Sequence, residues 1–207
     1  MGLIRRYAKR GGKLLDLGAA GGELGEAVRS HFHRTFGFEY QVDCIVDLKE
    51  RFDQVVVTDL EKLKRLPGGV DAVVCADVIE HLRDAPALLQ LIREGLARDG
   101  YLFVSVPNIA NITVRIGLLF GVFEYRERGI LDNTHLRFYT MRTIRRDLEN
   151  AGFRVIAVRG SSIPIRLIVG RFTPDFIVRA GEKILSILTR LWLSLFAYQI
   201  VVVASRK

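Results

Sequence analysis

Four carboxylates stand at or just past the ends of predicted buried strands. Asp16 ends an apolar run and Glu39 ends a short strand over 35–39, whereas Asp59 and Asp77 follow strands over 54–57 and 71–75. The carboxyl ends of parallel strands meet at one edge of an open sheet, and ligands bind outside that edge. Asp16 is a poor partner for a phosphate there and suits a cationic or hydroxyl-bearing ligand.

A glycine-rich turn lies beside the first of these carboxylates, in the stretch KLLDLGAAGGELGEAV at 13–28. Three leucines make a strand that needs burial on both faces; Gly18, Gly21 and Gly22 follow, and apolar residues then resume at helical spacing. Strand, glycine turn and helix together aim a helix N-terminus and its free amides at a ligand. Glycine also lets the ligand approach the backbone where a Cβ would clash.

Glu39 has the spacing of a ribose-binding acid. In a Rossmann-like βαβ unit, the acid that reaches the ribose hydroxyls lies about 20 residues past the glycine turn, and Glu39 fits that distance. Asp43 and Asp47 are rivals farther along the chain, but they fit better in a following helix.

The remaining elements predict an open, mostly parallel α/β sheet. We expect helices over 23–33, 85–98 and 140–150, the last capped by Thr140, and further strands over 101–106, 153–158 and 196–203. The two histidines His31 and His33 would end the first helix. Four βα units with polar residues after successive strands are typical of such a sheet.

Two segments do not fit simple βα connections. One, 109–139, is an apolar stretch followed by a polar one, and we expect it to cap the site. The other, 160–195, contains an amphipathic helix with Ile177, Ala180, Ile184, Leu188, Leu191 and Leu195 on one face. Residues 184–204 are nearly long enough to span a bilayer, but Arg190 and the β-branched run at 200–203 favour a strand.

The composition predicts one domain over 1–207, with these two insertions. A hydrophobic content of 49% in 207 residues supports a single core, and the net charge of +8 indicates an anionic partner or an arginine-rich solvated surface. Cys44 and Cys75 lie in unrelated segments, which predicts a reducing compartment and gives little support to a metal site. The basic N-terminus lacks the apolar stretch of a signal peptide, so we expect a cytoplasmic location, with peripheral membrane contact as a further hypothesis.

In this order the motifs resemble those of class I S-adenosylmethionine-dependent methyltransferases. The markers are LDLGAAGG at 15–22, Glu39, TDLE at 58–61, CADVIEHL at 75–82 and LFVSVPN at 102–108. VIEHL, SVPN and THLRFYT at 134–140 make the chain most similar to small methyltransferase domains related to ubiquinone-pathway O-methyltransferases and to those found beside glycosyltransferases. The resemblance implies a Rossmann-like sheet of seven strands with the last antiparallel and helices on both faces.

The resemblance also implies how S-adenosylmethionine would be held. Asp16 and the turn Gly18 to Gly22 would bind its methionine end, and Glu39 its ribose hydroxyls. The other implied contacts are Tyr40 on the adenine, Asp59 and the Leu60 amide on the adenine edge, and Asp77 with the Ala76 backbone near the sulfonium and ammonium. Asp59 and Asp77 could instead cap helices, and Tyr40 could be a surface aromatic.

Ala20 departs from the family pattern, because a glycine usually stands there. An alanine is tolerated if its φ is negative, and Gly21 would then absorb the sharp turn.

Two histidines are candidates for the base that a hydroxyl acceptor needs. His81 follows the fourth strand and His135 lies in the 109–139 segment, and an imidazole titrates near neutral pH. Alternatively, His81 braces its helix through Glu80, and His135 with Arg137 ties the insertion to the sheet.

The acceptor we expect is a hydroxyl of a small molecule, a lipid-linked compound or a sugar. Arg166, Arg171, Arg179 and Arg190 flank apolar runs, which suggests a membrane face or a lipid-linked or glycosyl substrate; packing of this helix on the sheet or in a dimer is the alternative. A nicotinamide-dependent oxidoreductase or epimerase would need G-x-G-x-x-G and a Tyr-x-x-x-Lys pair, which are lacking. A non-catalytic cofactor-binding module stays open. A nucleic-acid methyltransferase is disfavoured because SVPN is not an N/D-P-P-Y-type motif.

Overall fold

The computed structural model describes residues 1–163 and 173–207 and contains a seven-stranded sheet in the order β3-β2-β1-β4-β5-β7-β6. Arg166 and Arg171 lie outside the described residues. The strands are β1 (Gly12–Leu17), β2 (Phe32–Glu39), β3 (Gln54–Val57), β4 (Val70–Ala76), β5 (Leu96–Pro107), β6 (Phe153–Ser161) and β7 (Gln199–Arg206).

Strand β7 is antiparallel to both of its neighbours, β5 and β6, whereas the pairs formed by β1 to β5 are parallel. The expectation of a mostly parallel sheet with an antiparallel last strand is therefore confirmed. The register places Asp16 opposite Gly37 of β2 and Val74 of β4, in the middle of the sheet. Apolar side chains on both faces of β1 are fully buried, as the leucine run requires.

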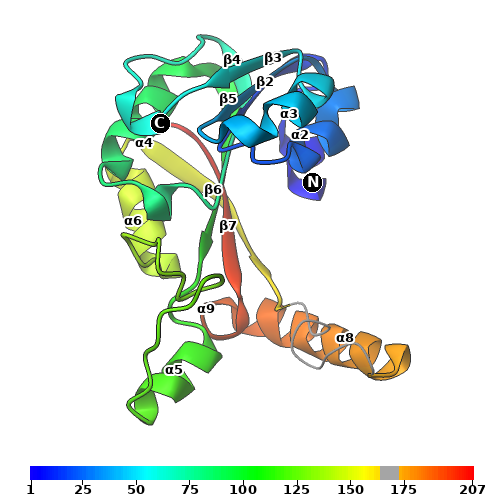
Figure 1. Ribbon diagram of the computed structural model, residues 1–207, viewed down its shortest axis with the longest axis vertical. Coiled ribbons are helices and arrows are strands. Elements are labelled where there is room, and N and C mark those ends of the chain that lie inside the picture. The colour runs from blue at the N-terminus through cyan, green and yellow to red at the C-terminus, as the bar shows by residue number, and fades with distance from the viewer. Residues whose placement is uncertain (164–172) are drawn as a thin grey trace.

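Helices cover both faces of the sheet, which is also confirmed (Figure 1). They are α1 (Gly2–Tyr7), α2 (Glu23–Val28), α3 (Ile45–Arg51), α4 (Ala85–Gly95), α5 (Ile112–Leu119), α6 (Met141–Asn150), α8 (Asp175–Leu191) and α9 (Leu193–Phe196). On one face, Leu88 of α4 and Ile144 of α6 pack with Leu15, while on the other Ile4 of α1 and Val28 of α2 pack with Leu14. Short 3₁₀ turns, including η3 (Leu60–Lys62) and η4 (Ile79–His81), follow β3 and β4.

Several predicted boundaries were wrong where pairing in the sheet overrides local preference. Helix α2 ends at Val28 and β2 begins at Phe32, so His33 lies in a strand and not at a helix end. Helix α4 ends at Gly95 instead of Arg98, because Leu96 is buried and pairs with Val70 at the start of β5. The last strand begins at Gln199 because Phe196 still belongs to α9.

The two predicted insertions both follow strands at the carboxyl edge of the sheet. Helix α5 follows β5 and α8 follows β6, and both extend away from the sheet at the same end of the molecule (Figure 1). Thr140 caps α6 as expected, through a reciprocal pair of bonds with Thr143. None of the helices in the described residues has the length and apolar content that a membrane span requires.

Candidate active site

The glycine turn follows β1 and contains three residues with positive φ. Gly18 has φ +72°, Ala20 +46° and Gly22 +83°, and the amides of Gly18 and Ala19 both donate to the Phe38 carbonyl. The expectation of a negative φ at Ala20 was wrong, and Gly21 does not take the left-handed turn. Ala20 is held in this conformation because its amide donates to Glu39 Oε2 at 2.7 Å. A left-handed alanine costs about 1–2 kcal/mol.

Glu39 closes the end of β2 over this turn. Its Oε1 accepts the amides of Tyr40 at 2.7 Å and Gln41 at 2.9 Å, while Oε2 accepts Ala20, and the side chain is buried. Each carboxylate oxygen has further lone-pair capacity, so Glu39 is positioned to accept ribose hydroxyls beside the turn. Tyr40 is 70% exposed, as a surface aromatic would be.

Asp16 is a largely buried carboxyl group in the middle of the sheet. It is 3% exposed and accepts no hydrogen bond from the part of the chain that the structure describes. Burial, followed by the nearby charge of Glu39, raises the pKa of Asp16 from 3.8 to about 7. A cationic ligand would favour its ionised form.

Asp77 leaves β4 with a left-handed backbone, φ +53°. Its Oδ1 accepts the Ser105 hydroxyl at 3.1 Å and its Oδ2 accepts the Gln199 side-chain amide at 2.6 Å. Asp77 therefore does not cap a helix; Val78 is the residue that precedes η4. Burial raises the pKa of Asp77 despite these two bonds. Non-glycine residues in this conformation cluster at functional sites.

The Asp59 side chain caps the 3₁₀ turn η3, as the alternative to adenine binding predicted. Its carboxylate accepts the Glu61 amide at 3.0 Å and lies 3.3 Å from Lys62 Nζ, at the start of η3. The bond from Glu61 holds the pKa of Asp59 below its usual value. A contact of Asp59 or Leu60 with adenine stays a prediction.

The acidic groups beside the glycine turn, at the carboxyl edge of the sheet, have no neighbouring cation in the described part of the chain that balances them. Among the described residues, no lysine or arginine forms an ion pair with Asp16, Glu39 or Asp77; the ion pairs found there involve Asp53, Glu23, Glu26, Asp59 and Asp147. A sulfonium and an ammonium group would supply the missing positive charge, so these residues fit S-adenosylmethionine. A pyrophosphate would add to the repulsion.

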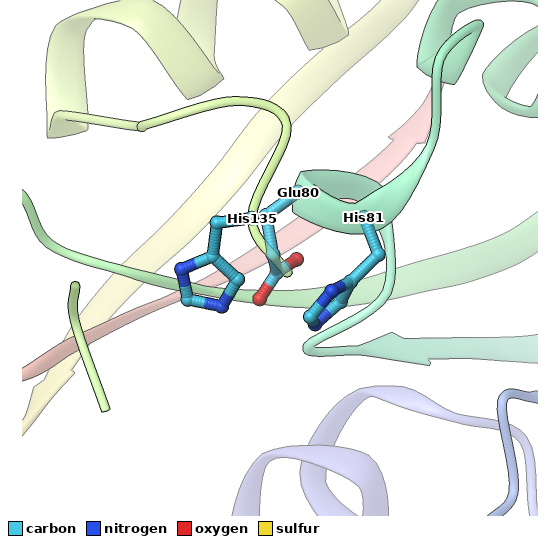
Figure 2. Close-up of side chains that lie close together, drawn as sticks. All are labelled: Glu80, His81 and His135. Atoms are coloured by element: carbon cyan, nitrogen blue, oxygen red, sulfur yellow. The ribbon is translucent and has the colours of Figure 1, made fainter. Parts of the chain in front are cut away.

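A second cluster joins η4 to the insertion. Figure 2 shows the Glu80 carboxylate between the rings of His81 and His135, whose centroids are 4.8 Å apart. One ligand atom from each of the three residues lies within 4.8 Å of the others, a spacing that could hold a divalent cation. No local motif joins the three residues, because His135 lies far along the chain from the other two; the one signal in the sequence is the Glu80–His81 pair in VIEHL.

Glu80 is the member of that cluster whose side-chain oxygens are buried without hydrogen bonds among the described residues. The residue is 1% exposed, and neither carboxyl oxygen has a hydrogen-bond partner in the part of the chain that the structure describes, whereas its backbone carbonyl accepts the Leu136 and Arg137 amides. Burial, with a smaller contribution from Asp77, raises the pKa of Glu80 from 4.5 to about 8. Without a cation, Glu80 is mostly protonated at neutral pH.

Both histidines turn one ring nitrogen toward the backbone. His135 Nδ1 lies 3.2 Å from the Ile130 carbonyl and His81 Nδ1 lies 3.3 Å from the Thr134 carbonyl. Because a carbonyl only accepts, these contacts assign the proton to Nδ1 and leave the Nε2 lone pair free. Burial, and then the proximity of His81, lowers the pKa of His135, so that its ring is neutral at pH 7.

Arg137 ties the insertion to the rest of the fold, which was the alternative to a role in acceptor binding. Its guanidinium donates to the carbonyls of Leu82 and Arg83, and so fastens the insertion to the segment after η4.

Comparison with known proteins identifies the family. A family model described as a methyltransferase domain matches residues 2–158. The ubiquinone biosynthesis O-methyltransferase of Cupriavidus pinatubonensis is 27% identical over 160 residues, which are 72% of this chain and 63% of that protein. The human mitochondrial ubiquinone biosynthesis O-methyltransferase is 28% identical over 162 residues, 72% of this chain and 43% of that protein. The chain thus spans less than two thirds of the length of either relative.

Solved structures agree on the fold. A SAM-dependent methyltransferase from Archaeoglobus fulgidus superposes with a TM-score of 0.68 at 23% identity, covering 99% of this chain and 92% of the other. An S-adenosylmethionine-dependent methyltransferase from Mesorhizobium loti gives 0.66 at 15% identity, with 99% and 96% covered. These findings show that the chain belongs to the methyltransferase domain family and has the fold of S-adenosylmethionine-dependent methyltransferases.

Proposed function

We propose that the chain methylates a hydroxyl oxygen of a small-molecule, lipid-linked or glycosyl acceptor. The observation that carries this proposal is the geometry of His135: its Nδ1 lies 3.2 Å from the Ile130 carbonyl, which leaves Nε2 to accept a proton, and its ring contacts that of His81 with centroids 4.8 Å apart. A hydroxyl acceptor needs such a base, because its proton must leave as the new bond forms. The two relatives described above are both O-methyltransferases of ubiquinone biosynthesis, which supports a hydroxyl acceptor.

The glycine turn and the acidic residues at the carboxyl edge of the sheet would hold the cofactor. Asp16 and the turn Gly18 to Gly22 would bind the methionine end, and Asp77 with the Ala76 backbone would lie near the sulfonium. Glu39 would accept the ribose hydroxyls, and each charge-assisted hydrogen bond contributes about 1.5–3 kcal/mol. The adenine contacts that we propose are Tyr40, Asp59 and the Leu60 amide. When bound, S-adenosylmethionine supplies an electrophilic methyl group.

His135 would take the acceptor proton on Nε2. Its Nδ1 bond to the Ile130 carbonyl fixes the tautomer and orients the ring. His81 would serve as its partner: its Nδ1–H donates to the Thr134 hydroxyl at 3.1 Å, and that hydroxyl donates to Asp132 at 2.6 Å. A base in this position contributes about 10²–10⁴-fold to the rate, and alignment of donor and acceptor supplies much of the rest.

The test measures methyl transfer from labelled S-adenosylmethionine to a panel of phenols, catechols, glycosides and isoprenoid-linked hydroxyl compounds. We expect transfer to at least one class, and we expect His135→Gln to lower kcat by about 10²–10⁴-fold with cofactor affinity unchanged. His33→Gln, remote on β2, is the control and should retain full activity. An unchanged kcat in His135→Gln would exclude the base.

Two further arms separate the alternatives. Calorimetry should show binding of S-adenosylmethionine and its demethylated product; binding of NAD alone would favour an oxidoreductase, and cofactor binding without transfer to any acceptor would favour a non-catalytic module. Activity lost on chelation and restored by Mg²⁺ would assign Glu80, His81 and His135 to cation binding in place of direct proton transfer.

A further inference from the structure

Helix α8 carries an apolar stripe that is exposed in the part of the chain that the structure describes. Phe176, Ile184 and Leu191 are 68%, 60% and 78% exposed, and Ile177, Ala180 and Ile187 are exposed on the same face. The buried residues of the helix, Val178 and Thr189, lie on the opposite face. The sequence alternative in which this apolar face packs on the sheet was therefore wrong for these residues.

Cations follow one border of the stripe. At 100° per residue, Arg179, Lys183 and Arg190 form a row next to Phe176 and Ile187, on the same helix. Among the described residues, no carboxylate forms an ion pair with any of the three cations. Long basic side chains beside apolar ones lay their stems along the apolar surface and keep their charge in water.

A groove with anion-binding chemistry adjoins this row. Between β6 and α8 lies a cavity of about 530 Å³, whose lining residues include Arg159, Arg190, Ser162 and Ser186. Two guanidiniums with hydroxyl donors match the geometry of a phosphate group. Arg190 belongs to both the groove and the cation row, so an anion there would lie beside the stripe.

We propose that α8 docks on an anionic lipid bilayer, with the stripe in the acyl boundary, the cation row among the headgroups and one lipid phosphate in the groove. This is how an amphipathic helix with a basic border lies in a membrane interface. Trp192, 58% exposed at the end of α8, has the side chain that favours such interfaces. Two copies facing each other through α8 would bring their cation rows close together, which disfavours a dimer.

Helix α5 supports the same geometry. Leu119 and Phe120 are 79% and 76% exposed, and α5 extends from the same end of the molecule as α8 (Figure 1). Both helices follow strands whose carboxyl ends form the edge of the candidate active site. One bilayer can therefore contact both helices beside the side from which the acceptor approaches.

The test is flotation of the full chain with phosphatidylcholine vesicles, with and without phosphatidylglycerol. We expect binding that needs the anionic lipid and weakens by about fivefold in Lys183→Gln and in Arg190→Gln, in line with the attraction of one basic residue to such a surface. The double change Ile184→Ser with Leu191→Ser should abolish binding. Lys64→Gln, which changes an exposed lysine in the connection between β3 and β4, removes the same charge away from α8; it is the matched control and should bind as the parent does.

Three results would overturn the proposal. These are absence of flotation with both vesicles, equal binding to both, or a dimer in analytical ultracentrifugation that Leu191→Ser dissociates. Arg159→Gln tests the groove, because this residue lies off the stripe: unchanged vesicle affinity, or tight binding of free inorganic phosphate, would remove the lipid phosphate from it. The changed side chains are exposed, so circular dichroism should confirm folding, and methyl transfer to a water-soluble acceptor should be retained. Failure here is thereby distinct from failure of the proposed function.

Discussion

Lowering the pH from 8 to 6 should weaken binding of S-adenosylmethionine by about tenfold through Asp16 alone. The pKa of this buried carboxyl is about 7 in the ligand-free protein, and a cationic ligand binds best to its ionised form. At pH 8 about nine tenths of the molecules carry the charge, whereas at pH 6 about one tenth do, so binding at pH 6 must first remove a proton. At pH 7 the binding should release about half a proton.

The assay is isothermal titration calorimetry at pH 6, 7 and 8 in buffers of different ionisation enthalpy. Asp16→Asn is the matched variant: its affinity should be lower at pH 8, and the part of the pH dependence and proton release that belongs to Asp16 should vanish. The ligand's own amino group titrates near pH 8 and persists in both proteins, so the difference between them isolates Asp16. Identical pH profiles for parent and variant would refute the reasoning, because the carboxyl would then not face the bound cation.

The same physical features give three further predictions. Glu39→Gln should weaken S-adenosylmethionine binding by about 10- to 100-fold in calorimetry, because a charge-assisted bond is worth about 1.5–3 kcal/mol; the exposed Glu94→Gln should have no effect, and an unaltered affinity in Glu39→Gln would contradict the ribose role. Ala20→Gly should stabilise the protein by about 0.5–1 kcal/mol in urea unfolding, since relief of about 1–2 kcal/mol of left-handed strain exceeds glycine's entropic cost; Ala19→Gly, at a buried position without positive φ, should destabilise it. Glu80 has a folded pKa of about 8, raised above its unfolded value of 4.5, so its contribution to stability is fully present below the unfolded pKa, falls by about 1.4 kcal/mol per pH unit between the two pKa values and is lost above pH 8. Glu80→Gln should remove that fall, and an equal change of the free energy of unfolding in parent and variant between about pH 5.5 and 7.5 would count against it.

The parts of the fold that could be predicted are those with a local signal. The leucine run before Gly18 and the apolar strand that ends at Cys75 need burial on both faces, and the structure places both strands at the centre of the sheet. Element ends were less predictable because pairing determines them. Nothing in 85–98 shows that Leu96 will pair with Val70, and that contact ends the helix three residues early.

In the candidate site, positions along the chain were predictable and contacts across it were not. The spacing of Glu39 from the glycine turn predicted which residue faces the turn, but not that its carboxylate would hold Ala20 at a positive φ. Likewise, VIEHL drew attention to His81, whereas only the folded insertion brings His135 against it. Long-range hydrogen bonds of this kind depend on the path of the loop, which a single sequence does not encode in any short motif.

The α8 arm is held in a fixed place relative to the site. Asn108 and Asn111 are both fully buried, and their side-chain amides donate to the Ala197 carbonyl at 2.9 and 2.8 Å. The backbone amide of Asn108 also donates to the Tyr198 carbonyl. Two residues after Ala197, Gln199 donates to Asp77. Because buried hydrogen bonds are costly to break, the segment that joins α9 to β7 fixes α8 and α9 relative to Asp77. A surface that binds α8 would therefore determine how the carboxyl edge of the sheet is oriented toward that surface. An acceptor embedded in the surface would then approach Asp77 from this edge.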